Sequence, residues 1–469
     1  MTELADARRL RQLLMGLALI LTFEGIVRKA APPGFGVPLF LLKDAMVTVM
    51  AYFVLRMPAA PAISFLWSGY KLLAFLFIPP ILVTMWHDPF LAIFGAKQYL
   101  LFPIVAFATF HAFQYSRMEE VVRFFSTLAL LIIPTSLVAF WELHLPHDHW
   151  LNRTVTGESL EAFQAAGELR VSSTFSFVAQ YCIFLNAQVF IFIIALYGWA
   201  RRSILWKILL ASLFPLLTLG SFITGSRGAV TVNFAIIMVA TMLTLLKFKI
   251  RNVLWITVIV GGLYTAVLAV SYFSPDSTAA YSERENGRMI GVSDEIANRI
   301  YTSFFLLSHD RFLWTPFGNG LGIMSNGSDT FSTYAEVWRN RSPWTETDFA
   351  TTLFEGGYYL VFVWYGFRIY VILSVVRRFL TGVNDATTIT GAFVTAFVVI
   401  TGAFGTLAIQ PPMAIWWWLG VGTSLTFWWK CVGPPDSELP KDTGGSMPMG
   451  PMRKPRGRSL YAETIHGRK

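Results

Sequence analysis

The sequence predicts an all-α fold, a polytopic membrane protein with about twelve transmembrane helices. Of its 469 residues, 55% are hydrophobic and 14% are charged, and the mean hydropathy is +0.54. Such a chain is far more apolar than a soluble domain. Apolar segments of roughly 17 to 25 residues recur from end to end, which is the length a helix needs to cross a bilayer. The alternating segments of about 10 residues that a β-barrel requires are not visible.

The hydropathy pattern places the spans in order along the chain. We predict spans at 12–28, 37–55, 62–84, 93–113, 124–141, 174–199, 206–223, 228–246, 252–273, 348–375, 388–407 and 411–429. The first is an uncleaved helix, since no small-residue cleavage pattern follows its basic start. Basic residues gather in connections on alternate sides, so the positive-inside rule assigns those sides and both termini to the cytoplasm. These residues are Arg56, Arg117, Arg123, Arg201, Arg202, Lys207, Lys247, Lys249, Arg251, Arg377 and Arg378.

The predicted domain organisation is a transmembrane domain over 1–430 and a disordered cytoplasmic tail over 431–469, suited to anionic headgroups. The opposite, external face holds a large loop, 274–347, between the ninth and tenth spans. Within it, 293–307 resembles a capped amphipathic helix, and 326–329 is typical of a turn.

Several functional classes lack support. The net charge of +9 comes from basic residues that punctuate apolar segments, so a nucleic-acid partner is not expected. With only two cysteines, Cys182 and Cys431, neither a disulfide framework nor a thiolate metal site is predicted. The chain has no Walker A sequence, dinucleotide fingerprint or Gly-x-Ser-x-Gly elbow, so we expect no cofactor. The absence of an internal repeat weakly disfavours a carrier.

Two arginines stand out on the predicted external face. Arg227 lies in the turn Thr224–Ala229 between two spans, where glycines let backbone amides approach an anion closely. A buried ion pair would be the alternative. Arg170 lies at the mouth of the sixth span beside a hydroxyl-rich turn, where it either binds an anion or anchors the span at the interface. The large loop contains six arginines, Arg311 among them, and no lysine. An arginine-only surface of this kind is what diphosphate binding would require. Pairing with the loop's own carboxylates explains most of them equally well.

Carboxylates follow at the start of the tenth span. Glu346 is placed to accept a proton from an incoming hydroxyl, although its charge also complements a helix N-terminus. The deeper Glu355 is expected to pair with an intramembrane arginine or lysine. Lys43 and Asp44 are expected to hold helices in register, and Lys71 and Lys97 need partners for the same reason. The cluster His144–His149 matches no helical ligand pattern, so we predict no metal site.

Taken in order, four motifs resemble the O-antigen ligase and polysaccharide polymerase superfamily of bacterial inner-membrane proteins. They are the arginine-hydroxyl turn of Arg170–Phe177, the turn Thr224–Ala229, the segment Pro316–Gly322 (Pro-Phe-Gly-Asn-Gly-Leu-Gly), and the polar start followed by Leu-Phe-Glu-Gly-Gly over Thr345–Gly357. The similarity covers roughly residues 125 to 375.

The resemblance implies a metal-independent glycosyltransferase of the GT-C type that transfers a glycan from undecaprenyl diphosphate to an acceptor hydroxyl on the periplasmic face. Arg170 and Arg227 match the arginines that hold the donor diphosphate, and Arg311 is a further candidate. Glu346 and Asp348 fall near the position of the base. Ligases have a histidine there, which favours a polymerase or another glycan-transferring relative.

The expected partners are the lipid-linked oligosaccharide, a glycan or lipid acceptor, the bilayer and polysaccharide assembly proteins. A flippase for the same lipids or a non-catalytic assembly subunit are the alternatives.

Overall fold

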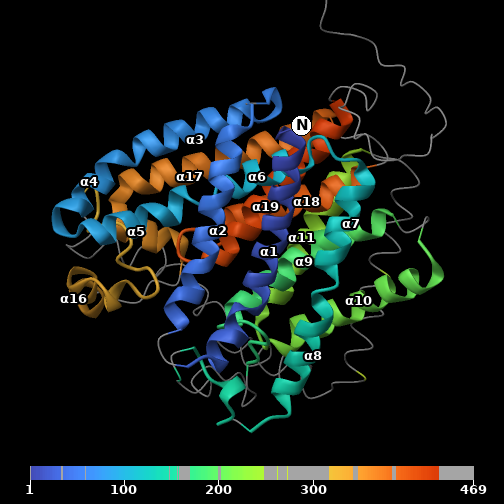
Figure 1. Ribbon diagram of the computed structural model, residues 1–469, viewed down its shortest axis with the longest axis horizontal. Helices are drawn as coiled ribbons and strands as arrows, with labels where there is room; N and C mark the ends of the chain where they lie inside the picture. The colour runs from blue at the N-terminus through green and yellow to red at the C-terminus, as the bar shows by residue number, and fades with distance from the viewer. Residues whose placement is uncertain are drawn as a thin grey trace, which may run out of the picture. The chain divides into compact units, whose positions relative to one another are not determined.

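The computed structural model is built from helices, and no extended strand occurs among the residues it describes (Figure 1). The described residues are 2–247 apart from 33–34, 59, 147, 156, 158–169 and 199–201; then 261, 272 and 316–341; then 347–432 apart from 383–386. Contacts divide the chain into one unit, Met1–Gly433, and a second, Pro434–Lys469, and every described residue belongs to the first.

The helices follow the apolar segments of the sequence. Each predicted span coincides with one or two of them, except 252–273, which lies almost wholly outside the described residues. In the first half of the chain they are α1 (Thr2–Ala30), α2 (Gly36–Arg56), η1 (Pro61–Ile63), α3 (Ser64–Leu76), α4 (Ile78–His87), α5 (Pro89–Leu100), α6 (Ile104–Phe113), α7 (Met118–Ala129), α8 (Ile132–Leu143) and η2 (Trp150–Asn152). In the second half they are α9 (Val178–Tyr197), α10 (Ile204–Ile223), α11 (Arg227–Leu246), η7 (Ser328–Thr330), α16 (Thr333–Arg341), α17 (Asp348–Gly382), α18 (Thr388–Phe404) and α19 (Pro411–Val432).

The described part of the chain contains 8 helices long and apolar enough to cross a membrane. A further span is formed if α5 and α6, which meet at an angle of 41°, are taken together. The bend falls at Leu101–Pro103, where Pro103 cannot donate a backbone hydrogen bond to the preceding turn. The chain is thus a membrane protein with several long apolar helices.

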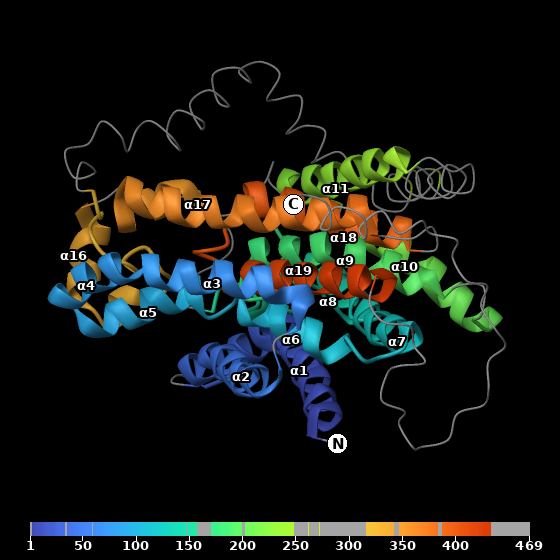
Figure 2. The ribbon, with the colours of Figure 1, turned by 90° about the horizontal axis from the view of Figure 1, so that it is seen from above.

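The centre of the bundle consists of α9, α18 and α19. The spanning window of α9 is 89% buried by protein, and α19 buries three consecutive tryptophans, Trp416–Trp418. Helix α18 packs on α9, α11, α17 and α19, whereas α6 packs on α1, α2 and α19. Figures 1 and 2 both show α18 and α19 enclosed by the other helices. By contrast, only 22% of the Pro61–His87 window and 28% of the α2 window are buried, which leaves their apolar faces for lipid.

Helix α17 contains a reversal that hydropathy does not reveal. Gly357 has φ 64° and ψ −168°, a conformation open to glycine but not to other residues. The Arg368 Nη1 and Asp348 Oδ2 atoms lie 2.6 Å apart, although a straight helix would separate these residues by about 30 Å. The predicted span 348–375 therefore consists of a short segment, 348–356, that folds back on the longer segment, 358–382.

Charged residues on α1, α2 and α5 are paired, as predicted for Lys43, Asp44 and Lys97. The Lys43 ammonium of α2 lies 3.3 Å from the Glu24 carboxylate of α1, and the Lys97 ammonium of α5 lies 2.7 Å from Asp44 of α2. Pairing offsets the cost of placing charge at membrane depth, and here it links α1, α2 and α5. The expected register network is confirmed, while Lys71 is exposed on α3.

Candidate functional site

Two of the predicted anion-binding motifs meet at Cys182, on the second turn of α9. Cys182 lies close enough to the Thr224 and Ser226 hydroxyls and to the Arg170 charge to interact electrostatically with all three. Its neighbours Val178 and Ala229 pack on it from α9 and α11. Residues more than 50 positions apart in sequence, one before α9 and the others between α10 and α11, thus converge on one point. Sequence reasoning did not identify Cys182 as their meeting point.

The turn that carries Arg170 is organised around a buried carboxylate. Glu142, near the end of α8, is fully buried and accepts hydrogen bonds from the Ser172 amide at 3.0 Å and the Ser173 amide at 2.6 Å. The Ser172 hydroxyl donates to the same carboxylate at 3.1 Å. Successive backbone amides that converge on one anion form a nest. No local sequence pattern pairs a glutamate with a turn 30 residues away, so sequence analysis missed Glu142.

Helix α1 holds the same turn from its other side. The Thr174 hydroxyl donates to the Thr22 carbonyl at 2.5 Å, and the Ile26 amide donates to the Thr174 carbonyl at 2.8 Å. A Cβ atom on Gly25 would lie 2.0 Å from the Phe175 carbonyl carbon. Glycine at position 25 is what permits this backbone-to-backbone approach.

The second motif is a tight turn that leads into a helix. The Ser226 amide donates to the Thr224 hydroxyl at 3.1 Å, and Gly225 has φ 59°. Ser226 then precedes α11, which begins at Arg227. The N-terminus of α11 therefore lies beside Cys182, on which Ala229 packs, and the helix dipole favours negative charge there. The Arg227 side chain lies outside the described part of the structure, as do Arg311 and Glu346.

Asp348 is described, and it is buried within the bundle. Its Oδ2 atom accepts from Arg368 at 2.6 Å and from the Trp364 indole at 3.2 Å, while Oδ1 accepts from the Ala408 amide at 2.7 Å. Arg368 also donates to the Gly402 and Gly405 carbonyls. These contacts give Asp348 a structural role, and its catalytic assignment remains a prediction.

Glu355 does not have the basic partner that we expected. It is buried and accepts from the Tyr99 hydroxyl at 3.0 Å and from the Met324 amide at 3.0 Å. The Pro316–Gly322 segment is docked here, since the Asn319 amide donates to the Phe354 carbonyl and a Cβ on Gly318 would lie 2.4 Å from the Gly356 nitrogen. Backbone amides of the loop, Met324 among them, take the place of the predicted arginine or lysine, because the Pro316–Gly322 segment packs on α17 where it reverses at Gly357. The two later motifs are therefore in contact with each other.

The described part of the 274–347 loop tests two further predictions. Gly327, with φ 83°, forms the turn predicted over 326–329, which confirms it. Arg339 pairs with Asp329 at 3.1 Å, in line with the expectation that loop arginines pair locally. The amphipathic helix predicted over 293–307 lies outside the described residues.

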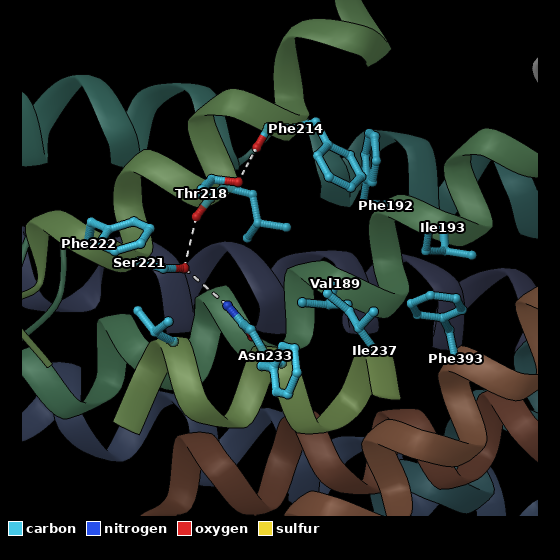
Figure 3. A pocket seen from close by; sticks show the side chains of 13 residues that line it. Val189, Phe192, Ile193, Phe214, Thr218, Ser221, Phe222, Asn233, Ile237 and Phe393 are labelled. Atoms are coloured by element: carbon cyan, nitrogen blue, oxygen red, sulfur yellow. Dashed lines mark hydrogen bonds between the residues drawn. The ribbon is translucent and has the colours of Figure 1, made fainter. Parts of the chain in front are cut away.

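A cavity of about 160 Å³ lies beneath the Thr224–Ala229 turn (Figure 3). Its wall is apolar apart from a polar seam in which Asn233 Nδ2 donates to the Ser221 hydroxyl at 3.0 Å. Ser221 is linked to the turn above, since the Thr224 hydroxyl donates to its carbonyl at 2.8 Å. The lining residues are Val189, Phe192, Ile193, Phe214, Leu217, Thr218, Ser221, Phe222, Val230, Asn233, Phe234, Ile237 and Phe393.

The described residues contain no group of three or more His, Cys, Asp or Glu side chains arranged to hold a metal ion. In the histidine cluster, His144 Nδ1 contacts the Phe140 carbonyl and His149 Nδ1 accepts from the Leu151 amide. His147 is outside the described part.

The helices and their burial define the class of this chain, a multi-span α-helical membrane protein. Comparisons with protein-family models, curated proteins and solved structures give no match.

Proposed function

We propose that this chain is a glycosyltransferase of the bacterial inner membrane with both termini in the cytoplasm. It transfers or polymerises a glycan carried on undecaprenyl diphosphate, joining it to an acceptor hydroxyl at the periplasmic face during surface-polysaccharide synthesis. The observation that carries the proposal is the convergence of Arg170 with the Thr224–Ser226 turn at Cys182. Both motifs act electrostatically on the same residue, which supports their assignment to one diphosphate site.

The chemistry of this arrangement suits a diphosphate leaving group. A guanidinium supplies a planar pair of donors to phosphate oxygens, and the first amides of α11 add a helix N-terminus. As the bond to the sugar breaks, charge develops on the diphosphate, and fixed donors stabilise that charge without reorganising. Arg170 and Arg227 are the proposed clamps, and Glu346 is the proposed base.

The apolar cavity fits the lipid part of the same donor. It begins one helical turn below Thr224 and is lined by aliphatic and aromatic side chains from α9, α10, α11 and α18. Its volume matches a short length of one aliphatic chain, with the diphosphate above it at the turn. Cavity and turn together would bind the two chemically different ends of an isoprenoid diphosphate.

The test is glycan transfer by purified protein in lipid nanodiscs, with undecaprenyl-diphosphate oligosaccharide as donor and an acceptor glycan. Products of the wild type are compared by mass spectrometry with those of Arg170→Ala, Arg227→Ala and Glu346→Gln. Loss of one electrostatic donor is expected to lower the rate by about 10²-fold or more. Arg153→Ala is the matched control, because Arg153 is an exposed arginine that lies, like Arg170, between α8 and α9, and its guanidinium donates to the Asp148 carbonyl.

Equal product from all variants would refute the site. If no product forms but labelled donor crosses vesicle membranes in a protein-dependent way, the flippase is the better function. Unchanged glycan output in cells that carry Arg227→Ala would favour the assembly subunit.

A further inference from the structure

Glu142 occupies a position where a carboxylate is costly. It is the penultimate residue of α8, and the C-terminal end of a helix carries partial negative charge that repels an anion. Its side chain is fully buried, and removing an ion from water costs several kcal/mol even after relaxation. A carboxylate is stable at this site only if its surroundings supply matching hydrogen bonds.

The hydrogen bonds to Glu142 come from the Ser172–Ser173 turn, and the Lys29 ammonium of α1 holds that turn from the other side. Both oxygens of Glu142 face the amides of Ser172 and Ser173. The Lys29 ammonium of α1 donates to the Ser172 hydroxyl at 2.7 Å and to the Leu151 carbonyl at 2.7 Å. The Ser172 hydroxyl therefore accepts a hydrogen bond from Lys29 and donates one to Glu142. It thereby connects α1, α8 and the Ser172–Ser173 turn.

The same turn contains an unfavourable backbone conformation. Ser173 has φ 55°, the one non-glycine residue with positive φ in the described part of the chain. An L-residue in this region is strained and persists only when its surroundings enforce it. Here the amide of Ser173 donates to Glu142, and its hydroxyl donates to the Thr135 carbonyl at 2.6 Å.

We propose that Glu142 and Lys29 are positioning residues that fix the Ser172–Ser173 turn and thereby direct Arg170 toward the proposed diphosphate site beside the Thr224–Ala229 turn. The inference rests on the proposed function, since it assigns a purpose to Arg170. Arg170 is two residues before Ser172, so a turn that relaxes moves the backbone from which its guanidinium extends. A glutamine side chain at position 142 has the shape of glutamate but offers one acceptor oxygen instead of two. Its NH₂ group would face the amides of the Ser172–Ser173 turn, which are themselves donors.

A double-mutant cycle tests the inference. Glu142→Gln, Arg170→Ala and the double variant are made in a Cys431→Ser background, and binding of farnesyl diphosphate is measured in nanodiscs by calorimetry on the folded fraction. If Glu142 acts through Arg170, each single variant weakens binding by about tenfold or more, and the double variant is no weaker than Arg170→Ala. Glu142→Asp, which keeps the charge, restores part of the affinity, and Lys29→Met weakens binding whereas Lys29→Arg does not.

A second readout follows the turn itself. Cys182 is then the one remaining cysteine, and its reaction with a small maleimide reports how the Arg170 turn covers it. We expect faster labelling in Glu142→Gln than in the parent protein. A merely stabilising role for Glu142 would lower the melting temperature but leave both the affinity of the folded fraction and the labelling rate unchanged, and that result overturns the inference.

The binding measurements separate the proposed function from the positioning role of Glu142. If the parent protein and Arg170→Ala bind farnesyl diphosphate equally, the proposed function and the positioning role both fall. If Arg170→Ala weakens binding while Glu142→Gln does not, or if the two effects add in full, the positioning role alone is refuted.

Discussion

The buried pair formed by Arg368 and Asp348 gives the most direct prediction about the stability of the bundle. Arg368→Met removes a cation that is 1% exposed and leaves Asp348, 3% exposed, without its counterion. The substitution also removes donors to the Gly402 and Gly405 carbonyls at 2.8 and 2.9 Å. Among the described residues, Asp348 then retains neutral donors, which include the Trp364 indole and the Ala408 amide.

The expected loss is large for a single substitution. Removing one partner from a buried ion pair costs about 3 to 5 kcal/mol, because the remaining charge stays desolvated. Asp348→Asn combined with Arg368→Met removes that charge and loses mainly the hydrogen bonds to the two glycine carbonyls, each about 0.5 to 1.5 kcal/mol. The double variant is therefore expected to be more stable than Arg368→Met by roughly 2 kcal/mol.

The assay is unfolding by SDS titration in mixed micelles, followed by tryptophan fluorescence. The free energy of unfolding is compared among the wild type, Arg368→Met, Asp348→Asn and the double variant. If the double variant unfolds at the same SDS fraction as Arg368→Met, or earlier, the unpaired carboxylate is not the source of the loss, and our account of the reversal in α17 is wrong. Glycan transfer by a folded double variant would, in addition, exclude Asp348 as the catalytic base.

Three further predictions concern close backbone approaches and an intramembrane charge. Gly25→Ala should destabilise the protein by about 1 to 3 kcal/mol or more, because its Cβ would lie 2.0 Å from the Phe175 backbone. The control Gly366→Ala, whose Cβ would meet nothing within 4 Å, should stabilise α17 by up to about 1 kcal/mol. Thermal unfolding in detergent distinguishes the two variants. Gly318→Ala should detach its loop from α17 and speed tryptic cleavage at Arg339, and equal cleavage in wild type and variant would contradict this. Lys97→Met should lower the melting temperature, because the buried Asp44 loses its ion-pair partner at 2.7 Å, with recovery when Asp44→Asn is added; no recovery would argue against the pair.

The sequence was most informative about the helices. Apolar runs bounded by basic residues or prolines predicted the positions of α2, α10 and α11 to within a few residues, because each is a single uninterrupted helix. Hydropathy averaged over a window contains no information on φ, so the reversal at Gly357 was hidden in a continuous apolar run. The pair Gly356–Gly357 was its one visible sign.

In the candidate site, too, sequence analysis found the residues that form local patterns and missed those that meet only through tertiary packing. Arg170 and the Thr224–Ala229 turn were found because glycine and hydroxyl residues beside an arginine form a local pattern. Glu142 and Lys29 were not, since their partners lie 30 and more than 100 residues away and follow only from tertiary packing. Glu355 was expected to need a cation because sequence alone did not reveal that a loop would bring amide donors to it.

The folded-back start of α17 also constrains how the chain is made. Synthesis runs from the N-terminus, so Asp348 and Arg368 leave the ribosome before Gly402, Gly405 and Ala408, which complete their hydrogen bonds. Until α18 and the following turn have entered the bilayer, the fold-back lacks three of its polar contacts. A nascent chain stopped between α17 and α18 would therefore hold the Asp348–Arg368 pair with only part of its hydrogen bonds satisfied by protein.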